Sequence, residues 1–309
     1  MAILIYVQNR DVSSWTDALL QEDPSLDIRV YPNIGNKKDI TFALTWPFPF
    51  GFWNQFPNLQ TICSIGAGVN HILSDSSIDQ HIHIVKLVDK NLSQNMWEYC
   101  LAAVSFYTMK INLYQNQQKK SIWKELEPPC FNTTTVGIMG LGSIGLSIAK
   151  NFAQLGFKVK GYSNTAKDIS KVETFCAKDS IEDFLHNVDI VISLLPLTTQ
   201  TKGIFNQTFF SKMKKGAYFI NAGRADQVIE KDLIEALNTQ QLNGAFLDVF
   251  KTEPLESSHP FWKHPKITIT PHVASITNPI SVAPQIVNNY RNTQKGYPLK
   301  NLVNIQSGY

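Results

Sequence analysis

The stretch VGIMGLGSIGLSIAK, residues 136–150, decides the fold. A short apolar run leads into three glycines at the spacing G-x-G-x-x-G, namely Gly140, Gly142 and Gly145, and a helical pattern follows. In a dinucleotide-binding βαβ unit, the first glycine permits the sharp turn out of the strand. The second lets the backbone approach a pyrophosphate, and the third lets helix and strand pack closely. The stretch therefore predicts a nucleotide-binding loop.

The segments around this loop favour a dinucleotide over a tight turn without a ligand, which is the alternative for glycine spacing alone. A strand precedes the loop, and a second strand is expected at FKVKGYS, residues 157–163. The backbone N–H groups of Ser143 and Ile144 would lie at the positive end of the helix dipole, where phosphates bind.

The tip of the second strand, GYSNTAKD (residues 161–168), bears on the choice of cofactor. Sites that prefer NAD usually place Asp or Glu there to accept a hydrogen bond from the ribose 2′-OH. In this chain Ser163 and Asn164 occupy the tip and Lys167 follows. Hydroxyl, amide and ammonium groups can donate to a 2′-phosphate, so we expect NADPH rather than NADH. Asp168 is the counter-evidence, because a kinked loop would bring it back toward the ribose.

Strand-like and helical segments alternate along most of the 309 residues, which predicts an α/β fold with doubly wound parallel sheets. A helix is expected at 13–21, a long one at 94–119 and a final one at about 278–294, followed by a tail returning to the first domain. The expected strands are 2–7, 27–32, 40–46, 59–65, 82–88, 134–139, 157–163, 189–195, 216–222, 244–250 and 267–271.

These elements predict two Rossmann-like domains with a cleft between them. A flavodoxin-like substrate domain comprises residues 1–99 and 281–309. A dinucleotide-binding domain, residues 100–280, is inserted into it.

Composition and charge exclude several classes of protein. Hydrophobic residues make up 43% of the chain, and the net charge is only +3, with Lys and Arg scattered, so we expect no nucleic-acid partner. No apolar run reaches the ~18 residues of a membrane span, and the N-terminus has the pattern of a strand rather than of a signal peptide. We therefore expect no membrane association and a cytoplasmic location.

The cysteines and histidines indicate neither disulfides nor a metal. Cys63, Cys100, Cys130 and Cys176 lie far apart with no C-x-x-C pair, as expected of free thiols in a reducing compartment. The pair His81-x-His83 lies in a strand pattern without a third ligand nearby, so no metal is expected.

Three later blocks place reactive side chains just after strand ends, the side of an open α/β sheet where ligands bind. FINAGRADQV contains Arg224, FLDVFKTEPL contains Asp248 and Glu253, and ITITPHVAS contains His272. Taken singly, each has a commoner structural role. Arg224 would be a surface or ion-paired arginine, His272 a core histidine with its hydrogen bonds made within the protein, and Glu253 a carboxylate that starts a helix. Their occurrence together favours a catalytic set.

With these blocks in order, the chain resembles the D-isomer-specific 2-hydroxyacid dehydrogenases over nearly its whole length. Within that family it is most similar to the branch that reduces glyoxylate and hydroxypyruvate. The stretches that carry the resemblance are SIGAGV, LLPLT, GAFLDVF, EPL and ITPHVA.

The resemblance implies, in agreement with the chemistry, that a 2-keto acid receives a hydride at C2 and a proton at its keto oxygen. His272 is the expected proton donor. Glu253, hydrogen-bonded to the other ring nitrogen, would orient the imidazole and favour the imidazolium. Arg224 would clamp the substrate carboxylate and polarise the carbonyl with a planar fork that Lys cannot copy.

Further contacts are implied by the resemblance alone. Asp248 is expected to lie near the nicotinamide carboxamide. The backbone N–H groups of Ala67 and Gly68 are expected to donate to the substrate carboxylate. Trp46 and Met96 are expected to line the substrate pocket, although a core or interface role suits Trp46 equally well. The expected cofactor contacts are completed by Leu195, Pro196, Ala222 and Gly223.

Two departures from the family pattern stand out. Gly223 and Ala225 flank the arginine where many relatives carry Ala-Arg-Gly, and Asn278 stands where the branch often has Arg, which bears on the substrate charge that is preferred. The family also predicts a homodimer formed through the helical region 94–119, the alternative being a helix packed wholly within its own chain.

Two other functions stay open from the sequence. One is a D-lactate-type or broad 2-ketoacid reductase. The other is a nucleotide-sensing, corepressor-like binding protein, which would hold the cofactor without consuming it.

Overall fold

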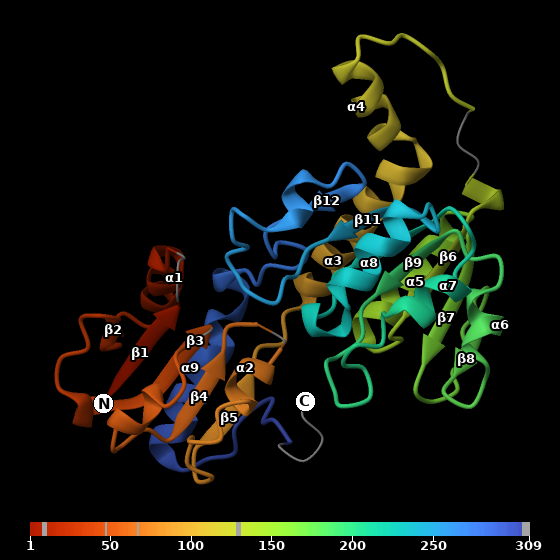
Figure 1. The fold of residues 1–309 in the computed structure, drawn as a ribbon. Coiled ribbons are helices and arrows are strands. Elements are labelled where there is room, and N and C mark those ends of the chain that lie inside the picture. Colours follow the sequence, from red (N-terminus) through yellow and green to blue (C-terminus); the bar gives the residue numbers. More distant parts are fainter. Residues whose placement is uncertain (8–10, 47, 67, 128–130, 305–309) are drawn as a thin grey trace. The chain divides into compact units, whose positions relative to one another are not determined.

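The computed structural model describes residues 1–7, 11–46, 48–66, 68–127 and 131–304. They form two compact units, one from Met1–Leu92 with Ile276–Tyr309 and the other from Ser93–Ser275 (Figure 1). The division into domains at 99/100 and 280/281 stays a prediction.

Unit one contains a parallel sheet with the strand order β2-β1-β3-β4-β5, the flavodoxin-like order. Side chains alternate between the two faces of each strand, and both faces are buried, which explains the nearly continuous apolar runs. The strands are β1 (Ala2–Val7), β2 (Ile28–Val30), β3 (Ile40–Trp46), β4 (Thr61–Ser64) and β5 (His83–Lys86).

Helices cover both faces of this sheet. α1 (Ser13–Glu22) and α9 (Pro279–Lys295) pack against each other and share a core with β1 and β3. α2 (Asn70–Leu73) and the short helix Phe52–Gln55 cover the opposite face. The tail after α9 returns to β5, because the N–H of Val303 donates to the carbonyl of Ile84 at 2.8 Å.

Unit two contains a parallel sheet with the order β12-β11-β10-β9-β6-β7-β8. Its first six strands in chain order follow the dinucleotide-binding order 3-2-1-4-5-6, and β12 extends it. The strands are β6 (Thr135–Met139), β7 (Lys158–Ser163), β8 (Glu173–Cys176), β9 (Ile190–Ser193), β10 (Ala217–Asn221), β11 (Leu242–Leu247) and β12 (Ile267–Ile269).

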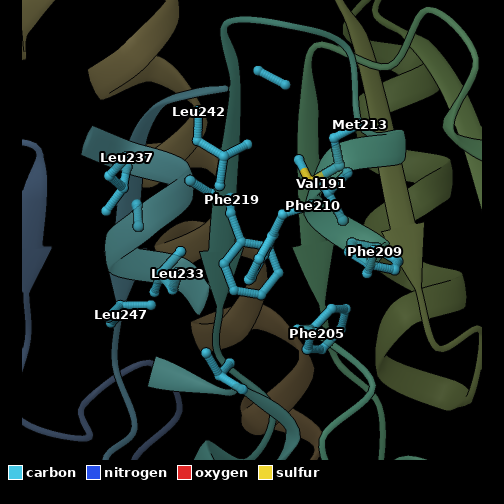
Figure 2. Packing of buried hydrophobic residues seen from close by; sticks show 14 of the residues in the cluster. Val191, Phe205, Phe209, Phe210, Met213, Phe219, Leu233, Leu237, Leu242 and Leu247 are labelled. Atoms are coloured by element: carbon cyan, nitrogen blue, oxygen red, sulfur yellow. The ribbon is translucent and has the colours of Figure 1, made fainter. Parts of the chain in front are cut away.

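Two apolar cores hold the faces of this second sheet. On one face α3 (Lys90–Thr108) and α5 (Ser143–Gln154) pack on the central strands. On the other face lie α6 (Ile181–Leu185), α7 (Gln207–Lys212) and α8 (Glu230–Asn238). Figure 2 shows this second core, where Phe205, Phe210 and Phe219 meet Leu233 and Leu237.

The expected single helix at 94–119 is wrong, because it is two helices. α3 ends at Thr108 and α4 (Ile111–Lys119) begins after Lys110, whose φ of 58° is left-handed. Neither Gly nor Pro marks this break in the sequence. Within unit two, α4 projects away from the sheet (Figure 1).

The strand β8 was not expected from the sequence. It has four residues at the edge of the sheet and none of them is buried, so it lacks an apolar run. Among the described residues, none of the helices has the length and apolarity needed to cross a bilayer.

Candidate active site

The glycine loop joins β6 to α5, and each glycine has a different physical reason. Gly140 has a φ of 104°, and a Cβ there would lie 2.9 Å from the carbonyl carbon and oxygen of Leu194. A Cβ on Gly145 would overlap the carbonyl oxygen of Gly140. A Cβ on Gly142 would meet no atom of the described residues within 4 Å. The packing of the chain itself therefore requires Gly140 and Gly145, whereas Gly142 faces open space.

The open space beside Gly142 fits a pyrophosphate. Gly142 is the N-cap of α5, and no side chain in the described part of the chain caps this end. The first-turn N–H groups, including those of Ser143 and Ile144, have no partners within the helix and can donate to an anion.

The tip of β7 is fixed by its own hydrogen bonds. Ser163 is 8% exposed, and its Oγ donates to the carbonyl of Thr165 at 2.7 Å. The carbonyl of Lys167 accepts from Thr174 Oγ1 at 2.6 Å. Because the hydroxyl proton of Ser163 is used within the loop, the exposed Asn164 and Lys167 are the side chains that can donate to a 2′-phosphate.

A buried glutamine joins the loops after β9 and β10. The side chain of Gln227 is fully buried, and its Nε2 donates to the carbonyls of Leu195 and Pro196, each at 2.9 Å. Its Oε1 accepts from the backbone N–H of Arg224 at 3.3 Å. The hydrogen bonds of Gln227 thereby join the loop after β10, which contains Ala222 and Gly223, to the loop after β9; the contact of these residues with a cofactor stays a prediction.

Arg224 follows directly in this loop, at the start of the short helix Ala225–Gln227. Its Nη1 donates to the carbonyl of Gly223 at 2.7 Å, and the residue is half-buried. Burial lowers the pKa of the Arg224 guanidinium, while the Glu253 carboxylate acts in the opposite direction. A guanidinium remains charged at neutral pH despite such a shift, so Arg224 offers a cation near Glu253.

Glu253 and His272 are joined by a hydrogen bond, which is an ion pair whenever the imidazole is protonated. The imidazole Nδ1 lies 2.7 Å from Glu253 Oε2, and Glu253 Oε1 accepts from the N–H of Phe250 at 2.9 Å. The side chain of His272 is 27% exposed and that of Glu253 is 33% exposed, so small molecules in the solvent can reach both. The carboxylate is thus held by the backbone and in turn orients the imidazole.

Asp248 holds the loop that carries His272. Its side chain is 1% exposed and accepts from Thr270 Oγ1 at 2.6 Å and from the N–H groups of Val273 and Ala274 at 2.9 and 2.8 Å. His272 has a φ of 54°, a left-handed conformation that is uncommon outside glycine and often found at functional sites. Burial raises the pKa of Asp248, and the three hydrogen bonds oppose this rise.

A tyrosine extends this network. Because Thr270 Oγ1 donates its proton to Asp248, it accepts from the hydroxyl of Tyr99 on α3, at 2.7 Å. The contact of Asp248 with a nicotinamide stays a prediction. Its hydrogen bonds show that it positions the residues on both sides of His272.

The candidate substrate residues of unit one lie close to the end of β4. Trp46 ends β3, and its ring lies 3.2 Å from where a Cβ on Gly66 would be. The ring also packs against His71, with centroids 4.4 Å apart. The carbonyl of Gly68 accepts from Ser64 Oγ at 2.7 Å. Ala67 lies outside the described residues.

The remaining predicted residues have structural partners of their own. Met96 is 8% exposed and belongs to the core of unit two with Cys100 and Ile148. Asn278 caps α9, where its side chain accepts from the N–H of Ile280 at 3.0 Å. Their roles toward substrate stay predictions.

Gln227 and Thr270 were not found from the sequence. Gln227 lies 31 and 32 positions away from its partners Pro196 and Leu195, and Thr270 is 22 positions from Asp248. The only local signal was proximity to Arg224 and His272, which does not reveal where an amide or hydroxyl points.

A glycine loop before an uncapped helix, with Arg, Glu and His after successive strands, defines a Rossmann-type oxidoreductase of the hydroxyacid class. The family model for the NAD-binding domain of D-isomer-specific 2-hydroxyacid dehydrogenases matches residues 101–274. The chain belongs to this family, which confirms the resemblance found in its sequence.

Full-length relatives point to one branch of the family. The chain is similar to the glyoxylate/hydroxypyruvate reductase A proteins of Yersinia enterocolitica (36% identity) and Photorhabdus laumondii (35% identity), with all of each chain covered.

Two solved structures share the fold. One is a D-isomer-specific 2-hydroxyacid dehydrogenase from Xanthobacter autotrophicus in complex with NADPH and MES, with a TM-score of 0.89, 34% identity, and coverage of 100% of this chain and 99% of the other. The second is an NADPH-dependent glyoxylate/hydroxypyruvate reductase from Sinorhizobium meliloti in complex with NADP and sulfate, with a TM-score of 0.90, 31% identity and the same coverage.

Proposed function

We propose that this protein uses NADPH to reduce small 2-keto acids, glyoxylate and hydroxypyruvate first among them, to 2-hydroxy acids. The hydrogen bond between His272 and Glu253, with the Arg224 cation near the same carboxylate, is the observation that carries this proposal. The relatives named as glyoxylate/hydroxypyruvate reductases support the choice of substrates.

NADPH is the cofactor that the described residues fit. The loop at Gly142 leaves room for the pyrophosphate, and Asn164 and Lys167 offer donors rather than a carboxylate at the 2′ position. When bound, the reduced nicotinamide supplies the hydride that is transferred to C2 of the keto acid.

The side chains of the protein handle charge and the proton. The planar fork of Arg224 would bind the substrate carboxylate and polarise the adjacent carbonyl. Since Nδ1 of His272 shares its proton with Glu253, the imidazolium would give its Nε2 proton to the keto oxygen as negative charge develops there. Glu253 then stabilises the cation before transfer and keeps the ring oriented.

Measuring whether NADPH is consumed distinguishes a reductase from a protein that only binds the cofactor. NADPH absorbance is followed with glyoxylate, hydroxypyruvate or pyruvate, and the same series is repeated with NADH. We expect NADPH consumption to be fastest with one of the first two acids. A protein that binds NADPH and consumes none of it with any keto acid would contradict the proposal and favour the corepressor-like alternative.

We also propose that the protein forms a homodimer through the helical region 94–119, with α4 and the following residues 120–127 as the exposed part of the interface. All nine residues of α4 are described and none is buried. The exposed side chains here include Leu113, Tyr114 and Trp123, the last 99% exposed. A second copy is the partner that this apolar surface fits, and the mass in solution tests it: Trp123→Ser should shift a dimer toward monomer, whereas a monomeric unmodified protein contradicts the proposal.

We propose a cytoplasmic location as well. The three cysteines in the described part of the chain, Cys63, Cys100 and Cys176, carry free thiols, which suits a reducing compartment. Cell fractionation followed by immunodetection tests this assignment.

A further inference from the structure

The amide of Gln227 uses its whole capacity for hydrogen bonds. An amide has two N–H donors and two acceptor positions on its oxygen. Here Nε2 donates to the carbonyls of Leu195 and Pro196, and Oε1 accepts from the N–H of Arg224 and from Ser193 Oγ, the latter at 3.2 Å. Carbonyl oxygens only accept, so the atom that faces two of them must be the NH₂ group, and the orientation of the amide is unambiguous.

This amide is the bridge between two loops with different tasks. Ser193 is the last residue of β9, and Leu195 and Pro196 follow it, on the side assigned to the cofactor. Arg224 follows β10 and is assigned to the substrate carboxylate. A planar, fully buried group that bonds to both loops fixes the distance between them, because it has no freedom left to rotate.

Because Gly223 has no side chain, it leaves room for the amide of Gln227. A Cβ on Gly223 would lie 3.0 Å from Gln227 Oε1 and 3.1 Å from the carbonyl of Leu195. Both contacts are tighter than nine in ten real Cβ contacts, so a neighbouring group would have to shift. The glycine that this chain carries directly before its arginine is therefore matched to the glutamine three residues after it.

We propose that Gln227 is a positioning residue that sets Arg224 relative to the cofactor loop Leu195–Pro196. Its fully buried side chain acts through the backbone of Arg224, whose carbonyl also accepts from the N–H of Gln227 and from Asn221 Nδ2, each at 3.3 Å. The inference rests on the proposed function, because it needs Arg224 to bind the substrate carboxylate.

The test replaces Gln227 by Met, which has nearly the same shape and makes none of the four hydrogen bonds. Gln227→Asn is the second variant, because a side chain one methylene shorter keeps an amide at the site but cannot reach both loops. Gln241→Met is the matched control: Gln241 Nε2 also donates to two backbone carbonyls, those of Phe210 and Met213 at 3.1 and 2.8 Å, away from the site.

Three quantities are measured for each folded variant: kcat/KM for glyoxylate, the inhibition constant of oxalate, and the Kd of NADPH. We expect both Gln227 variants to lose about tenfold or more in kcat/KM and to bind oxalate more weakly by a similar factor. The NADPH Kd should stay within about threefold. Gln241→Met should keep kcat/KM within about twofold, whatever its unfolding temperature.

Other outcomes overturn the inference. Unchanged kcat/KM in both Gln227 variants would do so, as would an equal loss in Gln241→Met. Weaker NADPH binding with unchanged oxalate binding would show that Gln227 serves the cofactor loop alone. If the unmodified protein consumes no NADPH with any keto acid, the proposed function fails instead, and the two failures are thus distinguishable.

Discussion

Replacing Gly142 by alanine separates cofactor binding from folding. The φ of Gly142 is −69°, a value that alanine adopts without strain, and its Cβ would meet no described atom within 4 Å. Alanine at an N-cap costs about 0.5–1 kcal/mol relative to glycine. The smaller entropy of the unfolded chain offsets this by about 0.4–1 kcal/mol. The free energy of unfolding should therefore change by less than about 1 kcal/mol, or a few degrees in Tm.

The same methyl group occupies the space assigned to the pyrophosphate. If the phosphate is displaced and loses one hydrogen bond to a backbone N–H, binding weakens by about 1.5–3 kcal/mol, since the acceptor is charged. This corresponds to roughly 10- to 150-fold in the Kd of NADPH. The Kd is measured by titration of NADPH fluorescence, and Tm by thermal unfolding without cofactor.

Gly145→Ala is the matched comparison. Its Cβ would overlap the carbonyl oxygen of Gly140, so the loop must move. We expect a loss of about 1–3 kcal/mol in the free energy of unfolding together with weaker NADPH binding. If Gly142→Ala binds NADPH as tightly as the unmodified protein, the pyrophosphate does not lie at this loop. If its Tm falls as far as that of Gly145→Ala, the space beside it is not open.

Three further substitutions test the site. His272→Asn should lower kcat for glyoxylate by about 10²–10⁴-fold at unchanged NADPH affinity, because the proton donor is lost; near-normal turnover would refute the acid role. Arg224→Lys should raise KM for glyoxylate and cost roughly 10-fold or more in kcat/KM, since the two-pronged contact is lost; an unchanged KM would place the carboxylate elsewhere. Asn164→Asp should move the ratio of kcat/KM for NADPH over NADH toward NADH, because a carboxylate repels the 2′-phosphate and accepts from the ribose; a constant ratio would exclude Asn164 from that contact.

The sequence predicted most of the fold because burial on both faces leaves a strong apolar signal. The strand at Ile40–Trp46 was predicted to the residue, and its first six positions are all buried. The strand Glu173–Cys176 gave no such signal, because an edge position leaves its residues partly exposed. The break at Lys110 was missed for a different reason: a lysine in a left-handed conformation is dictated by its surroundings rather than by its own preference.

In the candidate site, too, some features could be predicted from the sequence and others could not. Glycine spacing and the order of Arg224, Glu253 and His272 can be recognised because each residue type is tied to one chemical task. The bridging role of Gln227 depends on two loops that meet only in three dimensions. Likewise, no local sequence signal indicates that the Asp248 carboxylate accepts from the side chain of Thr270 before His272 and from the backbone N–H groups of Val273 and Ala274 after it.

The place of α9 in the chain has a consequence for biosynthesis. Val282, Ile286 and Tyr290 of this helix lie in the same core as Ile3 and Phe42, yet the ribosome makes residues 93–275 in between. At about 5–20 residues per second, one face of the first sheet waits roughly 10 to 40 seconds for its covering helix. During translation, the nascent segment 1–92 therefore presents bare apolar surface, the kind of surface that chaperones bind.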